Sequence, residues 1–332
     1  MIAMGIWAPD PYLADALFDA TSPLNRDDCL AAFRILRDRL DERGGCCHTI
    51  DVFRARGEAP DVVVFLDVPP QPAGLYLAGW RQARAWVVLQ ECEVIAPRNW
   101  DAERLAEFET IFTWRDAFVD DDRFVKLNFP NALTIPERFD LDTAERNLCV
   151  MIAGNKRADH PLELYSRRVE VIRWFERHHL DEFALYGVGW GGRPLGTGAQ
   201  ASAEPFPSWC GTVKAKRVTL RDYWFSICFE NARGIPGYIT EKLFDCLLAG
   251  TVPIYLGANN ITDHVPADCF IDARQFTALE QVYDAMVTTE PARYQQYLDA
   301  AREFLASSAA RPFSVEEYAD TLVRRIATCV TV

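Results

Sequence analysis

The chain alternates between short apolar runs and amphipathic stretches, which is typical of an α/β protein. Apolar runs of strand length predict strands buried on both faces of a parallel sheet. Stretches with apolar residues three and four positions apart predict the intervening helices. The predicted strands are Cys47–Phe53, Val62–Val68, Ala85–Leu89, Thr110–Trp114, Asn147–Ala153, Phe183–Tyr186, Phe225–Phe229 and Val252–Leu256. The predicted helices are Asp28–Arg43, Trp80–Arg84, Asp101–Phe108, Leu162–His178, Lys214–Tyr223, a segment from Ile239 that ends before Gly250, Thr277–Val287, Pro291–Ser307 and Ser314–Thr328.

The elements fall into two successive halves. Residues of about 135–146 are polar and lack periodicity, which indicates a linker. We therefore expect one Rossmann-like domain over residues 1–140, a second over 147–312, and a C-terminal helix over 313–332 that can pack back on the first domain. This order is typical of the GT-B fold, in which two Rossmann-like domains face each other across a cleft. Ligands in such sheets bind beyond the carboxyl ends of the strands, so we expect the chemistry in that cleft.

Composition narrows the class of protein. The 332 residues are 49% hydrophobic and 25% charged, as in a soluble globular protein, and the net charge of −13 argues against binding to nucleic acid. The ten cysteines show no CxxC spacing, so buried free thiols in a reducing compartment are expected rather than a zinc site. Neither a secretory signal nor an apolar run of about 18 residues is present. These features predict a cytoplasmic protein, and peripheral contact with a membrane stays open.

The most informative stretch is FSICFENARGIPGYITEKLFDCLLAGTVPIYL, residues 225–256. Its pattern predicts strand, loop, helix and strand, with Glu230 and Asn231 directly after the first strand. Lys242 falls in the first turn of the predicted helix, where the positive end of the helix dipole disfavours a cation. One interpretation is a solvated Glu241–Lys242 pair; the other is a phosphate site in which the ammonium and the helix N-terminus bind one anion.

The segments CFEN (228–231), GYITEK (237–242), AGTVPIYLG (249–257) and CFIDARQF (269–276) together resemble the donor-binding signature of glycosyltransferase family 10, the α-1,3/1,4-fucosyltransferases. The absence of an N-terminal membrane helix resembles the bacterial cytoplasmic members. The resemblance implies a GT-B fold and an inverting transfer of fucose, or a related sugar, from a GDP-sugar to a hydroxyl of a glycan acceptor. It also implies that the domain over residues 1–140 binds the acceptor and that the domain over 147–312 binds the nucleotide-sugar donor. GDP-fucose would be the donor substrate, no cofactor would be required, and a divalent cation would at most stimulate the reaction.

The resemblance also implies roles for particular residues. Glu91, just after a predicted strand, matches the segment that carries the family's proposed general base, with Glu93 as the runner-up. Arg168, with Arg167 as the alternative, matches an arginine that the family places against the diphosphate, together with Lys242. Arginine suits this role because its planar guanidinium donates to two oxygens at once.

The remaining donor-site residues follow from the same signature. Glu241 would accept hydrogen bonds from two ribose hydroxyls, and Tyr238 and Asn231 would contact the nucleotide or its sugar. Glu230 would either hold the sugar or orient the loop. Lys216 and Arg193 are weaker candidates, and we expect both to be ordinary surface charges.

Two further motifs have plain explanations. Gly187–Gly192 fits GxGxxG after a predicted strand, which would suggest a dinucleotide site, but Pro194 and further glycines predict a loop where that site needs a helix. Asp120–Asp122 resembles a DxD metal motif, but it lies in a polar segment and is expected to be a solvated turn. We expect no metal site.

The rival functions are a non-enzymatic sugar-nucleotide-binding protein on the same scaffold and, as a further alternative, an NAD-dependent oxidoreductase. The oligomeric state and the acceptor are not predicted.

Overall fold

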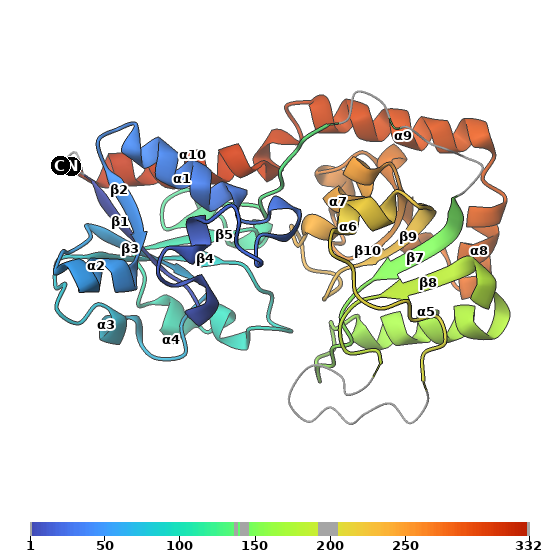
Figure 1. Ribbon diagram of the computed structural model, residues 1–332, viewed down its shortest axis with the longest axis horizontal. Helices are drawn as coiled ribbons and strands as arrows, with labels where there is room; N and C mark the ends of the chain where they lie inside the picture. The colour runs from blue at the N-terminus through green and yellow to red at the C-terminus, as the bar shows by residue number, and fades with distance from the viewer. Residues whose placement is uncertain (1, 136–138, 140–145, 192–204, 331–332) are drawn as a thin grey trace. The chain divides into compact units, whose positions relative to one another are not determined.

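The computed structural model describes residues 2–135, 139, 146–191 and 205–330. The chain divides into two units, Met1–Ala132 with Arg311–Val332, and Leu133–Ala310. Each unit is built on its own parallel β-sheet with helices packed against it (Figure 1). The expected α/β fold of the GT-B class, with two successive Rossmann-like sheets, is confirmed.

The first unit contains a six-stranded sheet in the order β2-β1-β3-β4-β5-β6, and every neighbouring pair is parallel. Its strands are β1 (Ala3–Trp7), β2 (Cys46–Thr49), β3 (Val62–Leu66), β4 (Arg84–Leu89), β5 (Thr110–Thr113) and β6 (Phe124–Lys126). Its helices are α1 (Ala31–Asp41), α2 (Ile50–Arg56), α3 (Ala73–Tyr76), α4 (Ala102–Leu105) and α10 (Val315–Val330).

Alternation along the strands divides the core of this unit into two layers. Val62, Val64 and Leu66 of β3 pack in one cluster with residues of α1 and α10. Val63 and Phe65 point to the opposite face and pack in a second cluster with residues of α2, α3 and α4. A strand that is apolar at every position is therefore covered by helices on both faces.

Two predictions for this unit are wrong, and two of its strands were missed. The run predicted as a strand over Cys47–Phe53 is β2 followed directly by α2, because Ile50 and Phe53 are buried at helical spacing. A short apolar run does not distinguish these structures by periodicity. The helix predicted over Trp80–Arg84 is absent, because 80–83 form a turn before β4; the short helix α3 lies earlier, at Ala73–Tyr76. Strands β1 and β6 were not predicted.

The second unit contains a five-stranded parallel sheet in the order β11-β10-β9-β7-β8. Its strands are β7 (Asn147–Ile152), β8 (Phe183–Tyr186), β9 (Tyr223–Phe229), β10 (Val252–Leu256) and β11 (Ile271–Asp272). Its helices are α5 (Tyr165–His178), α6 (Lys216–Leu220), α7 (Glu241–Ala249), α8 (Leu279–Val287) and α9 (Pro291–Ala306). Apolar residues of α5, α8 and α9 pack with this sheet in one core cluster.

The C-terminal helix α10 belongs to the first unit, although it follows α9 of the second unit in sequence. Just before α10, Ser314 forms a parallel bridge with Asn131, and Asn131 N–H donates to the Phe313 carbonyl at 2.8 Å.

Among the described helices, none combines the length and hydrophobicity that crossing a bilayer requires. The nine cysteines whose side chains are described are free thiols, and six of them are buried.

Candidate functional site

The predicted strand, loop, helix and strand between residues 225 and 256 are confirmed as β9, α7 and β10. Helix α7 begins at Glu241, two residues later than expected, because Thr240 acts as its N-cap and accepts a hydrogen bond from Lys242 N–H at 3.4 Å. Gly250 ends the helix with a φ of 71°, a left-handed conformation that glycine adopts without steric cost. Lys242 therefore lies in the first turn, as the pattern predicts.

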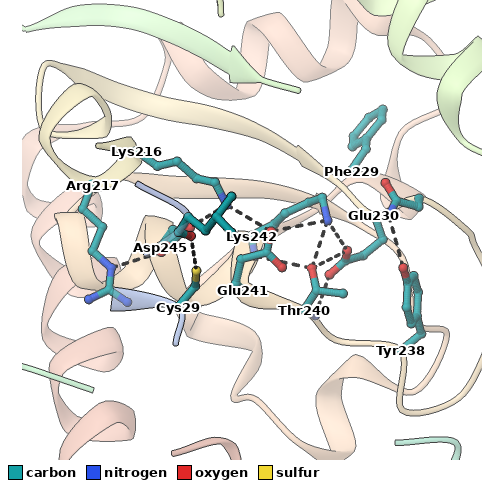
Figure 2. A network of polar contacts seen from close by, with 12 residues as sticks. Cys29, Lys216, Arg217, Phe229, Glu230, Tyr238, Thr240, Glu241, Lys242 and Asp245 are labelled. Carbon is teal, nitrogen blue, oxygen red and sulfur yellow. Dashed lines mark hydrogen bonds and ion pairs between the residues drawn. The ribbon is translucent and has the colours of Figure 1, made fainter. Parts of the chain in front are cut away.

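A buried carboxylate organises the start of this helix. Glu230 is 0% exposed and lies directly after β9. Its Oε1 accepts from Thr240 N–H at 2.9 Å, and its Oε2 accepts from the Thr240 hydroxyl at 2.7 Å and from Lys242 Nζ at 3.3 Å (Figure 2). A fully enclosed carboxylate does not contact a ligand. Of the two roles considered for Glu230, the structure thus favours orientation of the loop over binding of the sugar.

The same contacts explain how a cation is tolerated at a helix N-terminus. Lys242 Nζ lies 3.3 Å from Glu230 Oε2 and 4.0 Å from Glu241 Oε1, and its side chain is 21% exposed. Burial lowers the pKa of Lys242, but Glu241 and Glu230 outweigh this effect and leave the pKa raised. Lys242 is therefore a charged group at neutral pH that remains partly accessible to an anion.

Arg168, rather than Arg167, joins this site. The Arg168 side chain is buried, and its Nη2 donates to the Phe229 carbonyl at 2.6 Å and to Asn231 Oδ1 at 3.0 Å. Within the described residues, its Nε and Nη1 groups make no hydrogen bond. Burial lowers the pKa of Arg168, and Glu230 opposes that effect. Arg167 is instead partly exposed and pairs with Glu170 at 2.5 Å, as a surface arginine does.

Tyr238 is enclosed rather than displayed. It is 1% exposed, and its hydroxyl accepts from Asn231 Nδ2 at 3.3 Å. Asn231 is half-buried and is thereby held between Tyr238 on one side and Arg168 on the other. The Tyr238 hydroxyl orients the Asn231 amide, and its contact with the nucleotide or its sugar stays a prediction.

The prediction that Lys216 is an ordinary surface charge is wrong. Lys216 Nζ lies 3.0 Å from Glu241 Oε1 and 3.2 Å from Asp245 Oδ2, and Arg217 Nε lies 3.0 Å from Asp245 Oδ1 (Figure 2). Asp245 is buried in α7, one turn after Glu241. Burial raises the pKa of Glu241, but Lys216 and Lys242 outweigh this and leave the pKa well below its usual range.

These contacts form a chain of alternating charges in the second unit. Its members, from one end to the other, are Arg217, Asp245, Lys216, Glu241, Lys242 and Glu230. The sequence signal that could have revealed it is Asp245, an acidic residue one turn after Glu241 in an otherwise apolar helix, since a buried carboxylate requires a cationic partner. Arg193 lies outside the described residues.

In the first unit, Glu91 follows β4 at the carboxyl edge of the sheet, as expected, and is half-buried. Its main chain is held by two side chains. Asp67 Oδ1 accepts from Gln90 N–H at 2.6 Å and from Glu91 N–H at 3.1 Å. Asn99, which is 0% exposed, donates from Nδ2 to the Glu91 carbonyl at 3.0 Å and to Asp67 Oδ1 at 2.7 Å.

Sequence reasoning missed Asp67, although an acidic residue directly after the buried strand β3 is a recognisable signal. Asp67 has a φ of 63°, a left-handed conformation that is uncommon for residues other than glycine and that occurs at functional sites. Burial raises its pKa above the ordinary value, despite the hydrogen bonds that it accepts. Asp67 therefore belongs with Glu91 and Asn99 in one polar cluster.

Glu93, the alternative base, is engaged in an ion pair. Its Oε1 lies 2.6 Å from Arg115 Nη2, and both side chains are 17% exposed. The Arg115 guanidinium also lies over the Trp100 ring, 4.4 Å from its centroid. Glu93 is thus engaged with Arg115, and the assignment of the base to Glu91 stays a prediction.

The two other motifs lack the context of a ligand site in the described residues. Asp120 Oδ1 accepts from Asp122 N–H at 3.0 Å and Phe124 N–H at 2.8 Å, as in a polar turn. Gly187–Gly191, the described part of the GxGxxG motif, forms bends and turns. No group of three or more potential metal-binding side chains occurs within the described parts of the chain.

Comparison with known proteins finds a family match in the C-terminal part of the chain. Residues 195–323 match Glycosyltransferase family 10 (fucosyltransferase) C-term. An Alpha-(1,4)-fucosyltransferase of Arabidopsis thaliana is 38% identical over 80 residues, which are 24% of this chain and 20% of that protein. The Alpha-(1,3)-fucosyltransferase FucT of Helicobacter pylori is 35% identical over 72 residues, 22% of this chain and 15% of that protein. The matched segments thus span about a fifth of these relatives or less.

Solved structures extend the similarity of fold to both units. A crystal structure of an α1,3-fucosyltransferase is similar over 98% of this chain and 89% of that chain, with a TM-score of 0.57 and 15% sequence identity. The structure of α1,3-fucosyltransferase with GDP-fucose gives a TM-score of 0.53 at 15% identity, over 98% of this chain and 90% of that chain. At this identity, the comparison supports the fold alone.

The Asp67 cluster predicts a specific dependence of stability on substitution and pH. Asp67→Ala removes the acceptor of three donors and should lower the free energy of unfolding by about 3 kcal/mol. Asp67→Asn keeps an acceptor oxygen and removes the ionised form. Because the native pKa is raised, the stabilisation from protonated Asp67 is complete below the unfolded pKa of about 4 and is lost as pH rises through the native pKa.

Urea unfolding over a pH series measures both effects. The stability of Asp67→Asn relative to the wild type should increase as pH rises from below about 4, and should become constant above the native pKa. A relative stability that falls with rising pH would show that Asp67 is stabilised as a carboxylate.

Proposed function

We propose that the chain transfers fucose, or a related sugar, from a GDP-sugar to a hydroxyl of a glycan acceptor, with inversion at the anomeric carbon, because residues 195–323 match the C-terminal domain of glycosyltransferase family 10. The observation that carries this proposal is the convergence of Lys242, Arg168 and the N-terminus of α7 at the carboxyl end of β9. The similar fold of an α1,3-fucosyltransferase solved with GDP-fucose is consistent with this donor.

The departing GDP carries the charge that this site stabilises. The bond between the anomeric carbon and the β-phosphate oxygen breaks, and the electron pair leaves with the diphosphate. Lys242 is held charged by Glu241 and Glu230, and the first turn of α7 adds the positive end of the helix dipole. Arg168 retains N–H donors beyond those that bind Phe229 and Asn231. Preorganised positive charge of this kind lowers the barrier most where negative charge develops.

The nucleoside part of the donor is assigned to Glu241 and Asn231. The Glu241 side chain is 43% exposed and is kept ionised by its two lysine neighbours, so it can accept hydrogen bonds from two ribose hydroxyls. The Asn231 amide, oriented by Arg168 and Tyr238, would contact the sugar or the nucleotide. The leaving-group charge is assigned to side chains rather than to a metal ion.

The acceptor proton is assigned to Glu91. An inverting transfer requires a base on the face of the sugar opposite the departing GDP, because the acceptor oxygen forms its new bond from that side. Glu91 would take the hydroxyl proton as this bond forms. Its main chain is anchored by Asp67 and Asn99, which supports a fixed position for the base.

Removal of the Lys242 charge tests the diphosphate site. Lys242→Gln keeps a donor for Glu230 and should lower the rate of fucosyl transfer from GDP-fucose about 100-fold or more, with a much smaller change in unfolding free energy. Arg167→Gln is the control, because it removes a nearby cation that pairs with Glu170. Its transfer rate and its unfolding free energy should stay unchanged. Equal losses of stability and rate in Lys242→Gln would make the lysine a structural residue.

Substitution of Glu91 tests the base. Glu91→Gln should lower transfer about 100-fold or more, while the Kd for GDP, measured by calorimetry, stays at the wild-type value. Glu93→Gln should retain most of the transfer activity. The reverse pattern would assign the base to Glu93, and absence of turnover in the wild type with any glycan acceptor would favour a sugar-nucleotide-binding protein.

Lys216 is expected to act through Glu241. Lys216→Met should weaken GDP binding about tenfold, because Glu241 loses the partner that fixes its orientation. The loss should be much smaller for 2′,3′-dideoxy-GDP, which lacks the ribose hydroxyls. Arg217→Met is the matched control, since Arg217 also pairs with Asp245 but is separated from Glu241 in the chain of charges by Asp245 and Lys216. Equal losses for both nucleotides would exclude a role through the ribose.

A further inference from the structure

A groove of about 630 Å³ lies in the second unit, beside the start of α5. Part of its lining comes from the segment before α5 and from the first turns of this helix, between His160 and Glu170. The rest comes from residues at or after the ends of β9, β10 and β11, which are Arg233, Leu256, Ala273 and Phe276. The volume falls in the range of small-molecule sites, about 300–1,000 Å³.

The groove is distinct from the candidate donor site. Arg167 lines the groove, whereas its neighbour Arg168 is buried and donates to the Phe229 carbonyl at 2.6 Å. Successive residues of an α-helix point about 100° apart, so α5 directs one arginine to each site. None of the described residues assigned to the donor lines the groove.

Main-chain contacts hold the sides of the groove together. Glu163 and Ala232 form an antiparallel bridge between the segment before α5 and the loop after β9. On either side of this bridge, Leu164 N–H donates to the Asn231 carbonyl at 3.1 Å, and Arg233 N–H donates to the Leu162 carbonyl at 2.9 Å. The groove is therefore preformed, and a ligand does not have to order it.

The floor of the groove is apolar and continues into the core. Leu256, Ala273 and Phe276 are half-buried and line both the groove and a cavity of about 20 Å³. Apart from Arg167, the lining of this cavity is apolar. Such a cavity has room for one small group but offers a water molecule almost no hydrogen-bond partners. An apolar group of a ligand would therefore fill it.

The acidic side chains of the groove are engaged by their neighbours. Glu170 Oε1 lies 2.5 Å from Arg167 Nη1, so these two charges neutralise each other. Glu163 Oε2 accepts from Ser166 N–H at 2.9 Å, and its Oε1 accepts from the Ser166 hydroxyl. The carboxylates are thus spent on the first turns of α5.

The groups that remain for a ligand are donors. The Arg233 side chain is exposed, and among the described residues its contacts are limited to a long hydrogen bond from Nη2 to the Pro161 carbonyl, at 3.4 Å. His160 Nδ1 accepts from Leu162 N–H at 3.2 Å, which leaves Nε2–H of the neutral ring as a donor. The two donors are close together, because Arg233 contacts the residue next to His160.

We infer that this groove binds a small monocarboxylate with an apolar or aromatic tail. The carboxylate lies on Arg233 and His160, and the tail lies over Ala273 and Phe276 toward the cavity. A guanidinium binds a carboxylate through two parallel N–H groups, and a single arginine without an acidic partner matches a single negative charge. The inference goes beyond the transferase function and does not rest on it, because this binding requires neither donor nor acceptor.

Calorimetric titration of the full chain with 3-phenylpropionate and hexanoate tests the inference. The comparison compounds are 3-phenylpropanamide, which keeps a tail without the charge, and acetate, which keeps the charge without a tail. At least one of the two tailed carboxylates should bind the wild type about tenfold or more tightly than either comparison compound.

Two variants test the two ends of the groove. Arg233→Gln removes the charge, and Ala273→Leu fills the passage to the cavity; each should weaken binding of the tailed carboxylate about tenfold. Arg221→Gln is the matched control, since Arg221 is an exposed arginine of the same unit that does not line the groove. Its affinity should equal that of the wild type, and thermal unfolding verifies that each variant is folded.

Failure of both tailed carboxylates to bind the wild type would overturn the inference. Equal affinity for 3-phenylpropionate and its amide, or wild-type affinity in both groove variants, would do the same. Repeating the titration with saturating GDP separates the two sites, because displacement of the carboxylate by GDP would place it in the donor site instead. Carboxylate binding in a protein that binds no GDP would count against the transferase alone.

Discussion

The buried ion pair between Glu230 and Lys242 is the constraint on which the second unit depends. A carboxyl group that is 0% exposed is stable only when hydrogen-bond donors satisfy it, and here Thr240 and Lys242 do so. The same contacts fix where α7 begins and draw an ammonium to the end of the helix that ordinarily repels it. Glu241 and Lys216 extend the pattern outward, so that each charge is held by one of opposite sign.

The first unit uses a related arrangement at its own strand ends. Asp67 follows β3 as Glu230 follows β9, and both carboxylates accept hydrogen bonds from main-chain N–H groups of a neighbouring segment. In each case a strand-end acid fixes the residue proposed to do chemistry, Glu91 in one unit and Lys242 in the other. The acids with the most rigid surroundings therefore serve as supports, while the partly exposed groups are left for ligands.

The accuracy of the sequence-based predictions followed the range of the interactions involved. The helix start near Lys242 was predicted within two residues, because its cap and its apolar spacing lie within one short stretch. The segment after Cys47 was assigned wrongly, because Ile50 and Phe53 fit a strand or a helix equally well until the neighbouring layers are known. Lys216 was taken for a surface charge because its partner Glu241 lies 25 residues away.

By itself, the sequence determined the α/β class, the two successive sheets, the strand–loop–helix–strand unit around α7 and the family signature within it. These features depend on periodicity, capping and contiguous motifs, which are local. Only the tertiary structure decided that Arg168 rather than Arg167 meets the end of β9, that Asp67 and Asn99 hold Glu91, and that a groove forms between the start of α5 and the ends of β10 and β11. These contacts join residues far apart in the chain, as Arg168 and Phe229 are at 61 positions, and hydrophobic periodicity specifies which face of an element is buried but not which distant side chain it meets.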